Sequence, residues 1–341
     1  MRHLRPASCL LLLLAAACGG SETPTQGQPE GPPLVGLLLD RLEHERWERD
    51  RDLFTRRVEE LGGQVLVRTG DGDPDRQAAE ATALLDAGAK VLVVVAADLE
   101  RAGDIVAAAA ARDVPVISYD RLIRNADVAL YVSFDNVKVG RMQAEHLLST
   151  APRGNYLLLG GSPTDNNAML VRQGQMEVLK PAIDSGDVRI AADPWIQDWS
   201  GERAREATAE ALKRTRRLAA VVASNDAIAG GAIEALAAGE LAGKVPVSGQ
   251  DADLAACRRI VAGTQAMTVY KPLTPLARMA AGAAMSLVKG QPVDSLVTVN
   301  NGAKEVPARL MDPISVDKSN IDVTVISDGY HSREAVYGAA N

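Results

Sequence analysis

Aromatic residues are scarce in this chain, which has 341 residues but only 2 Phe, 6 Tyr and 3 Trp. Proteins that stack on the bases of single-stranded nucleic acid need more rings than this. A basic excess is missing too, and the formal net charge of -7 argues against a partner with a phosphate backbone. Hydrophobic residues make up 47% of the chain and charged residues 24%, so we expect a globular protein with no nucleic-acid partner. At roughly 150 residues per domain, the length suggests two domains.

Cysteine and histidine are also rare, with 3 Cys and 4 His in the whole chain. The histidines are far apart and lack the spacing of zinc ligands, so we expect no metal site and no cofactor. Cys9 belongs to the leader described next and Cys18 to its processing site, which leaves Cys257 without a partner for an intrachain disulfide. We therefore interpret Cys257 as a buried structural residue.

The first residues have the order and size of a secretory signal peptide, with a basic start and an apolar run too short to span a bilayer. We predict a signal peptide at residues 1–17. Cys18 follows three alanines, which resembles the bacterial lipoprotein signal, in which this cysteine is acylated. The leucine usually found three positions earlier is Leu14, four positions away, so simple secretion is the alternative to lipidation of Cys18. The prediction is a periplasmic or cell-surface protein, attached to the membrane only through a lipid anchor.

Residues 18–33 contain Gly or Pro at 8 of 16 positions and no large apolar side chain. Such a segment cannot build a packed core. We predict that it is a tether, which holds the folded body away from the membrane surface.

From Leu34 onward, short apolar runs rich in β-branched residues alternate with amphipathic stretches rich in Ala, Arg and Glu. The apolar runs, expected as strands, are residues 34–39, 64–67, 91–95, 114–118, 156–159, 188–191, 219–223, 245–247 and 267–270. Every run except the last is followed by an expected helix. Because this alternation builds parallel sheets with helices on both faces, the predicted fold class is α/β with two such sheets.

Polar residues follow nearly every expected strand, and ligands of open α/β sheets bind at the carboxyl ends of the strands. Carboxylates, amides and cations beside tryptophan suit a pyranose, whose hydroxyls both donate and accept hydrogen bonds and whose apolar face packs on a ring. A single Asp or Asn after a strand is more often a helix N-cap, and we interpret Asp226 in this way. Seven such stations are harder to explain as caps: Asp40 with Arg46 and Trp47, Asp120 with Arg121, Asp165 with Asn166 and Asn167, Trp195 with Trp199, Asn225 with Asp226, Gln250 with Asp251, and Lys271.

Several segments at these stations together resemble one protein family. They are ERWERDRD at residues 45–52, SYDR at 118–121, SFDN at 133–136, GGSPTDNN at 160–167, ASND at 223–226, SGQDAD at 248–253 and TVYKP at 268–272. The set is similar to the bacterial D-xylose-binding proteins, which are type I periplasmic sugar-binding proteins of ABC importers. The likeness runs from about Val35 to His331, essentially the whole expected mature body.

The resemblance implies a set of sugar contacts in this sequence: Arg46, Asp120, Arg121, Asp165, Asn167, Trp199, Asn225, Asp251 and Lys271. It implies that Trp199 stacks on the sugar while the others hydrogen-bond to its oxygen atoms. Asp40 and Trp47 match the family as well, as supports of these contacts. The chain departs from the family at residues 96–98 and at Arg41 and Glu43, which border the expected cleft and leave the exact sugar open.

The same resemblance implies two Rossmann-like lobes joined by three hinge strands, with the sugar between them. The N-terminal lobe would comprise residues 34–138 and 272–297, and the C-terminal lobe residues 139–271 and 298–341. A sugar that contacts both lobes favours the closed state over the open one, which drives closure.

The leading hypothesis is a receptor, expected to be a monomer, that captures D-xylose and delivers it to an ABC permease in the membrane. One alternative is a receptor for another monosaccharide, such as ribose, arabinose or glucose; another is a sugar-sensing lipoprotein that signals to a membrane histidine kinase. A sugar-modifying enzyme would need an acid and a base, for which Asp120 and Asp251 are candidates. Arg121 and Lys271 would keep both carboxylates ionised, so no enzymatic activity is expected.

Overall fold

The computed structural model describes residues 31–42, 45–215 and 217–338. The predicted signal peptide, Cys18 and nearly all of the predicted tether lie outside the described residues, as does Glu43. The chain from Pro32 onward forms one compact unit, which is described by itself.

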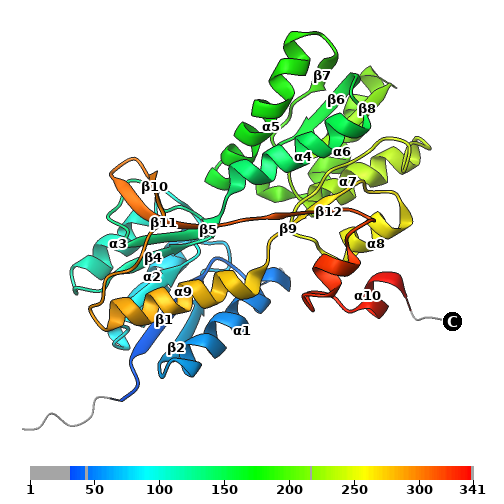
Figure 1. Cartoon of the computed structure of the whole chain (residues 1–341). Helices are drawn as coiled ribbons and strands as arrows, with labels where there is room; N and C mark the ends of the chain where they lie inside the picture. Colours follow the sequence, from blue (N-terminus) through cyan, green and yellow to red (C-terminus); the bar gives the residue numbers. More distant parts are fainter. Residues whose placement is uncertain (1–30, 43–44, 216, 339–341) are drawn as a thin grey trace, which may run out of the picture. The chain divides into compact units, whose positions relative to one another are not determined.

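The first of two main sheets has seven strands in the order β10-β11-β5-β4-β3-β1-β2 (Figure 1). All neighbours pair in parallel except β10, which runs antiparallel to β11. The strands are β1 (Leu34–Leu39), β2 (Gln64–Thr69), β3 (Val91–Val94), β4 (Val116–Tyr119), β5 (Leu130–Phe134), β10 (Val297–Asn300) and β11 (Glu305–Met311).

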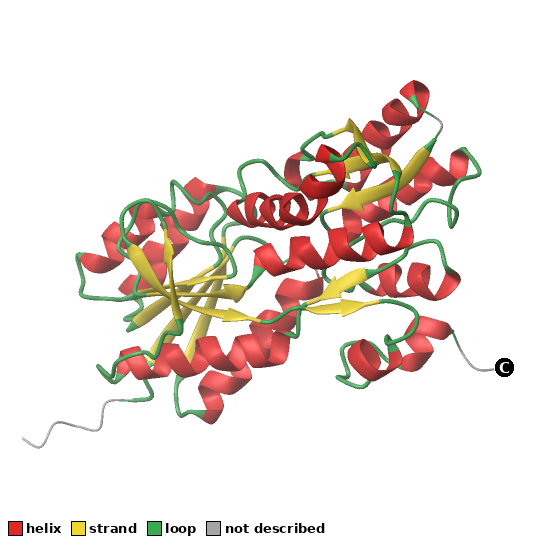
Figure 2. Ribbon diagram, turned by 45° about the horizontal axis from the view of Figure 1, so that its top comes forward, coloured by secondary structure: helices red, strands yellow, loops and turns green. Residues whose placement is uncertain are grey.

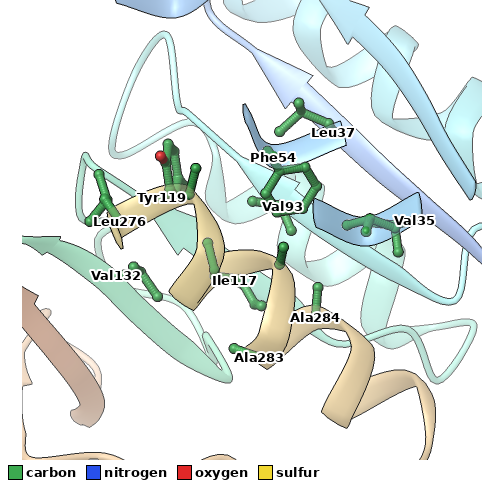
Figure 3. Close-up of a cluster of buried hydrophobic side chains, with 14 of the residues drawn as sticks. Val35, Leu37, Phe54, Val93, Ile117, Tyr119, Val132, Leu276, Ala283 and Ala284 are labelled. Atoms are coloured by element: carbon green, nitrogen blue, oxygen red, sulfur yellow. The ribbon is translucent and has the colours of Figure 1, made fainter. Parts of the chain in front are cut away.

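Helices cover both faces of this sheet. Successive side chains of each strand point to opposite sides, so each strand contributes to two separate cores. Val35 and Leu37 of β1 pack with Phe54 and Leu276, on the face covered by α1 (Glu45–Glu60) and α9 (Leu273–Val288) (Figure 3). Leu38 packs in a separate core on the other face, covered by α2 (Pro74–Asp86) and α3 (Gly103–Ala110). With both faces buried, the strands can be apolar along their whole length.

The second main sheet has three parallel strands in the order β7-β6-β8 (Figure 1). Figure 2 shows the strands, in yellow, flanked by helices, in red. These are β6 (Gly154–Leu159), β7 (Val188–Ala192) and β8 (Leu218–Ala223). One face packs on α4 (Asn136–Thr150) and α5 (Asn166–Asp184), and the other on α6 (Gly201–Arg214) and α7 (Asp226–Ala238). The expected strand at residues 245–247 is reduced to two isolated parallel bridges, Val247 with Val221 and Val245 with Ala242.

A small antiparallel pair, β9 (Thr268–Tyr270) and β12 (Ile314–Val316), lies apart from both main sheets in the pairing order. The chain leaves the seven-stranded sheet after β5, returns to its face as α9 after β9, and leaves again from β11 to β12. These three crossings match the three hinge strands that the resemblance implied. The remaining elements are α8 (Leu254–Ala262), α10 (Arg333–Tyr337), the short helix η1 (Gln197–Trp199) and the π-helical turn η2 (Asp322–Ile326).

The α/β prediction with two helix-covered parallel sheets is confirmed, but one boundary is wrong. Residues 298–311 were expected in the C-terminal lobe, whereas β10 and β11 belong to the seven-stranded sheet. The physical reason is the pairing of Ala308–Met311 with Tyr131–Phe134, which completes the sheet beyond β5. Strand β5 and helix α9 were also absent from the expected strand–helix alternation.

Candidate functional site

All of the residues predicted to contact a sugar line one cavity of about 460 Å³. The seven-stranded sheet and its helices supply one group, and the three-stranded sheet with its helices supplies another. The first group is Arg46, Asp120 and Arg121, with the expected supports Asp40 and Trp47; the second is Asp165, Asn167, Trp199, Asn225 and Asp251; Lys271 directly follows β9.

Several of these residues come directly after a strand, where the carboxyl ends of parallel strands meet at one edge. Asp40 follows β1, Asp120 follows β4 and Lys271 follows β9. Asp165 and Asn225 are also helix N-caps: Asp165 Oδ1 accepts from the Asn167 amide at 2.9 Å, and Asn225 Oδ1 accepts from the Ile228 amide at 2.9 Å. At these two positions capping and cavity lining go together.

Several cavity residues have a left-handed backbone, which costs a residue other than glycine about 1–3 kcal/mol. The φ angle is 63° at Asp120, 99° at Asp251, 58° at Asp198 and 56° at Trp199. Strained positions of this kind persist only where surrounding contacts hold them, and they concentrate at functional sites.

Asp120 is the most enclosed carboxylate of the cavity, with 3% of its surface exposed. Its backbone carbonyl accepts from Tyr131 Oη at 3.0 Å and Ser133 Oγ at 2.8 Å, which holds the left-handed turn. Its carboxylate accepts from Arg46, and its Oδ1 accepts from Asn167 Nδ2 at 3.2 Å. Burial by itself would raise the pKa of Asp120, but the neighbouring Arg46 and other cations lower it below its ordinary value. Asp120 is therefore an ionised acceptor at neutral pH.

Arg46 lies among three carboxylates and links both sides of the cavity. It pairs with Asp120, with Asp50 through Nε at 3.3 Å, and with Asp251 at 3.8 Å. Although burial opposes the charge, these carboxylates raise the pKa of Arg46 well above its usual value. The Lys271 ammonium, 4% exposed, lies 3.0 Å from Asp251 Oδ1 and forms a second cation–carboxylate pair.

The two expected supports hold arginines in place. Asp40 Oδ2 accepts from Arg121 Nη1 at 2.8 Å, and Arg121 also donates to the Ala96 carbonyl at 2.9 Å and lies 3.6 Å from Asp165. The Trp47 ring lies under both guanidinium groups, 4.5 Å from that of Arg46 and 5.8 Å from that of Arg121. Such cation–π contacts fix the planes of the arginines before any ligand arrives.

Asp50 is a buried member of this network that was not predicted from the sequence. It is 1% exposed, pairs with Arg46, and accepts from the Tyr119 hydroxyl. Burial raises the pKa of Asp50 from 3.8 to about 6, although Arg46 and the Tyr119 hydroxyl oppose the shift.

We expect the stability of the protein to depend on Asp50 between about pH 4 and pH 6. Because the folded state binds this proton more tightly, stability is fully present below the unfolded pKa of 3.8 and is lost as the pH rises through about 6. Relative to Asp50→Asn, the wild type should lose about 3 kcal/mol over this window. Urea unfolding at pH 4, 5, 6 and 7 measures the difference, with the exposed Asp52→Asn as control. A difference between wild type and Asp50→Asn that stays constant with pH would contradict this expectation.

Two adjacent glycines make room for two tryptophans. A Cβ at Gly160 would lie 2.7 Å from Trp195, and one at Gly161 would lie 2.2 Å from the six-membered ring of Trp199. Trp199 Nε1 also donates to Asp165 Oδ2 at 3.3 Å, and the ring lines the cavity. Trp195 does not line the cavity, and its ring lies 5.1 Å from the Arg172 guanidinium instead. The absence of side chains at Gly160 and Gly161, after β6, thus allows the two indole rings to pack against the backbone.

The interpretation of Asp226 as an N-cap is wrong, because Asn225 caps α7. Asp226 is 1% exposed, and its carboxylate accepts from Asp253 N at 3.0 Å, Thr268 Oγ1 at 2.9 Å and Gln265 Nε2 at 2.8 Å. Burial, with Asp253 and Asp251 nearby, raises its pKa well above the ordinary value. Asn166, another expected station residue, lies outside the cavity lining and accepts from Arg124 Nη1 at 3.4 Å.

Further polar residues of the lining were not predicted as contacts. They are Arg41, Ser162, Thr164, Asp198, Gln250 and Asp253. Gln250 had been named as a strand-end station and Arg41 as a residue bordering the cleft, whereas the other four had no signal beyond their closeness in sequence to predicted contacts.

Within residues 31–42, 45–215 and 217–338, no group of His, Cys, Asp and Glu side chains could hold a metal ion. Cys257 is buried, as expected, and burial raises its pKa to about 12. Over the same described part of the chain, every helix is too short or too polar to cross a membrane.

Comparison with known proteins places this chain in a family. Residues 35–292 match the model of the periplasmic binding protein domain. The D-xylose-binding periplasmic protein of Haemophilus influenzae is 48% identical over 304 residues, which cover 89% of this chain and 92% of that protein. The multiple sugar-binding periplasmic receptor of Rhizobium radiobacter is 32% identical, with 96% of this chain and 99% of that protein covered.

Solved structures agree. A carbohydrate transporter solute-binding protein from Chloroflexus aurantiacus, in complex with D-glucose, matches with a TM-score of 0.81 and 32% identity, over 88% of this chain and 97% of that one. The family resemblance of the strand-end segments is thereby confirmed. The chain belongs to the periplasmic binding protein family, as a close relative of its D-xylose-binding members.

Proposed function

We propose that this protein binds D-xylose in the cavity between its two main sheets and delivers it, chemically unchanged, to an ABC importer. The observation that carries the proposal is the convergence of all the predicted contact residues on one cavity. The 48% identity to a D-xylose-binding periplasmic protein over nearly the whole length supports the choice of sugar.

The chemistry of the lining favours a neutral polyol. Carboxylates, amides and guanidinium groups can each engage neighbouring hydroxyls in pairs, and Trp199 offers a ring for the apolar face of a pyranose. Six aspartates and four basic residues line the cavity, so its charge disfavours an anionic sugar acid. Because Arg46 and Lys271 already pair with carboxylates, a neutral ligand leaves no buried charge without a partner.

Calorimetric titration with D-xylose, L-arabinose, D-ribose and D-glucose tests the proposal. D-glucose is the most informative competitor, since it is bound in the Chloroflexus aurantiacus structure. We expect D-xylose to bind most tightly. Tight binding of one of the other sugars, without heat from D-xylose, would refute the assignment of the sugar but not that of a sugar receptor.

We further propose that Cys18 is acylated, so that the receptor works tethered to a membrane. The support is the leader with its small residues before Cys18 and the Gly/Pro-rich segment after it. Cys18→Ser should move the protein from the membrane to the soluble fraction, as judged by immunoblotting of fractionated cells. Cys257→Ser is the control, since this buried thiol should have no influence on localisation. A membrane-bound Cys18→Ser variant would rule out acylation as the attachment.

A further inference from the structure

Gln250 lies on the cavity wall next to the predicted contact Asp251, in the loop that follows Val247. Its surface is 4% exposed. The resemblance did not assign Gln250 a contact. The unusual feature of this residue is the hydrogen bonding of its side-chain amide.

The backbone around Gln250 is held from several directions. Its carbonyl accepts from Asp226 N at 3.0 Å, and the Asp253 amide donates back to Asp226 Oδ2 at 3.0 Å. The amides of Asp251 and Ala252 donate to Val269 O at 2.8 Å and Thr268 Oγ1 at 3.2 Å. Asp226 thus clamps the loop at both ends, which supports the left-handed conformation of Asp251 and Ala252.

The Gly249 position adds to this rigidity, because a Cβ there would lie 1.9 Å from Asp226 Oδ1. A loop fixed in this way holds the Cα of Gln250 in one place. The freedom that remains is in the side chain.

The side-chain amide of Gln250 makes no hydrogen bond within the described chain, and its Oε1 is buried without a partner. An unsatisfied buried polar atom costs about 1–3 kcal/mol. Protein interiors tolerate few such atoms, and each calls for an explanation.

The other buried glutamines show what this chain does with an amide that serves the fold. Gln77, Gln143, Gln175 and Gln265 each donate through Nε2 and accept through Oε1. For example, Gln175 accepts from Arg172 Nε at 2.9 Å and donates to Gln143 Oε1 at 2.8 Å. None of these four lines the cavity, whereas Gln250 does. The amide that is unused by the fold is therefore the one at the ligand site.

We propose that Gln250 is a further sugar-binding residue, whose amide bonds a hydroxyl group of the ligand and contributes to the choice between sugars. The proposal rests on the proposed sugar-binding function. A primary amide suits this role, because it accepts and donates at once and thereby matches a hydroxyl, which does the same.

The test is a titration of wild type and Gln250→Leu with D-xylose and with the four analogues that each lack one hydroxyl. Gln250→Leu should weaken D-xylose binding about 10-fold, the order expected for one lost hydrogen bond. For the analogue without the contacted hydroxyl, wild type and variant should bind alike. An equal loss with every ligand, or no loss with any, would overturn the role of Gln250 while leaving the sugar-receptor function intact.

Thermal unfolding without ligand separates binding from folding. Gln250→Leu should keep or raise the midpoint, since it removes an unpaired buried amide, while Gln175→Leu should lower it and retain the affinity for D-xylose. A lowered midpoint in Gln250→Leu would indicate a structural residue and count against the proposal. If the wild type binds none of the sugars tested, the proposed function fails, and the role of Gln250 fails with it.

Discussion

Replacing Asp251 by alanine is expected to lower the free energy of unfolding by about 3 kcal/mol and to weaken sugar binding about 10- to 100-fold. The structural cause is Lys271, whose Nζ lies 3.0 Å from Asp251 Oδ1 while only 4% of the residue is exposed. Without Asp251 this ammonium stays buried without its nearest counterion, and Arg46 loses one of its three carboxylates. Removing one partner of a buried ion pair destabilises a protein far more than replacing both partners by apolar residues, because it leaves a buried charge uncompensated.

A double-variant cycle distinguishes this cause from a general loss of packing. Asp251→Ala with Lys271→Met leaves no unpaired charge, so the double variant should be more stable than Asp251→Ala without regaining the affinity for the sugar. It should stay less stable than the wild type, because alanine is strained at the φ angle of 99° found at position 251. Urea unfolding followed by tryptophan fluorescence gives the stabilities, and calorimetry gives the affinities. A double variant no more stable than Asp251→Ala would show that the pair is not the reason.

Asp198→Asn is the matched control for this cycle. Asp198 lines the same cavity but is exposed, and among the described residues its side chain accepts only from Gln197 Nε2 at 3.2 Å. Its φ angle of 58° is one that asparagine tolerates. The substitution should change the stability by no more than about 0.5 kcal/mol.

The predicted contact residues line one cavity because several of them come from strand ends. Asp120 and Lys271 directly follow apolar runs, and parallel pairing alone brings such residues to one edge. Asp50 could not be found in this way, and Gln250 was found at a strand end but was not assigned a contact. The raised pKa of Asp50 depends on burial by residues far away in the chain, and the unused amide of Gln250 becomes visible only when the partners of every other buried glutamine are known.

The fold shows the same division between local and distant information. Strands of the form Val91–Val94 are recognised by composition, whereas the place of β11 in the first sheet depends on its pairing with β5, which is more than 170 residues earlier. No local pattern specifies that pairing. The same holds for α9, whose apolar face is matched to α1 across the first core.

Gly140→Ala is expected to lower the free energy of unfolding by about 3 kcal/mol, the upper range for overpacking a well-packed interface. Helices α4 and α5 are in backbone contact: a Cβ at Gly140 would lie 1.9 Å from the Val171 carbonyl oxygen, and one at Gly174 would lie 1.9 Å from that of Val137. Backbone atoms cannot swing aside as the end of a side chain can, so the two helices must separate.

The same separation should reach the sugar site, because α5 carries Asn167 near its N-terminal end. Asn167 Oδ1 accepts from Asn136 Nδ2 at 3.0 Å at the start of α4, and its own Nδ2 donates to Asp120. Moving the helices apart therefore pulls Asn167 from Asp120, and we expect weaker sugar binding in Gly140→Ala. Urea unfolding and calorimetry measure the two effects.

Gly282→Ala in α9 is the control with the opposite expected sign. No atom lies within 4 Å of a Cβ at Gly282, and the residue is inside a helix, where alanine is preferred by roughly 0.5–1 kcal/mol. This variant should be more stable than the wild type and bind the sugar equally well. If Gly140→Ala matched the wild type in stability, α4 and α5 could not be in backbone contact, and the coupling of their packing to Asn167 would be lost as an explanation.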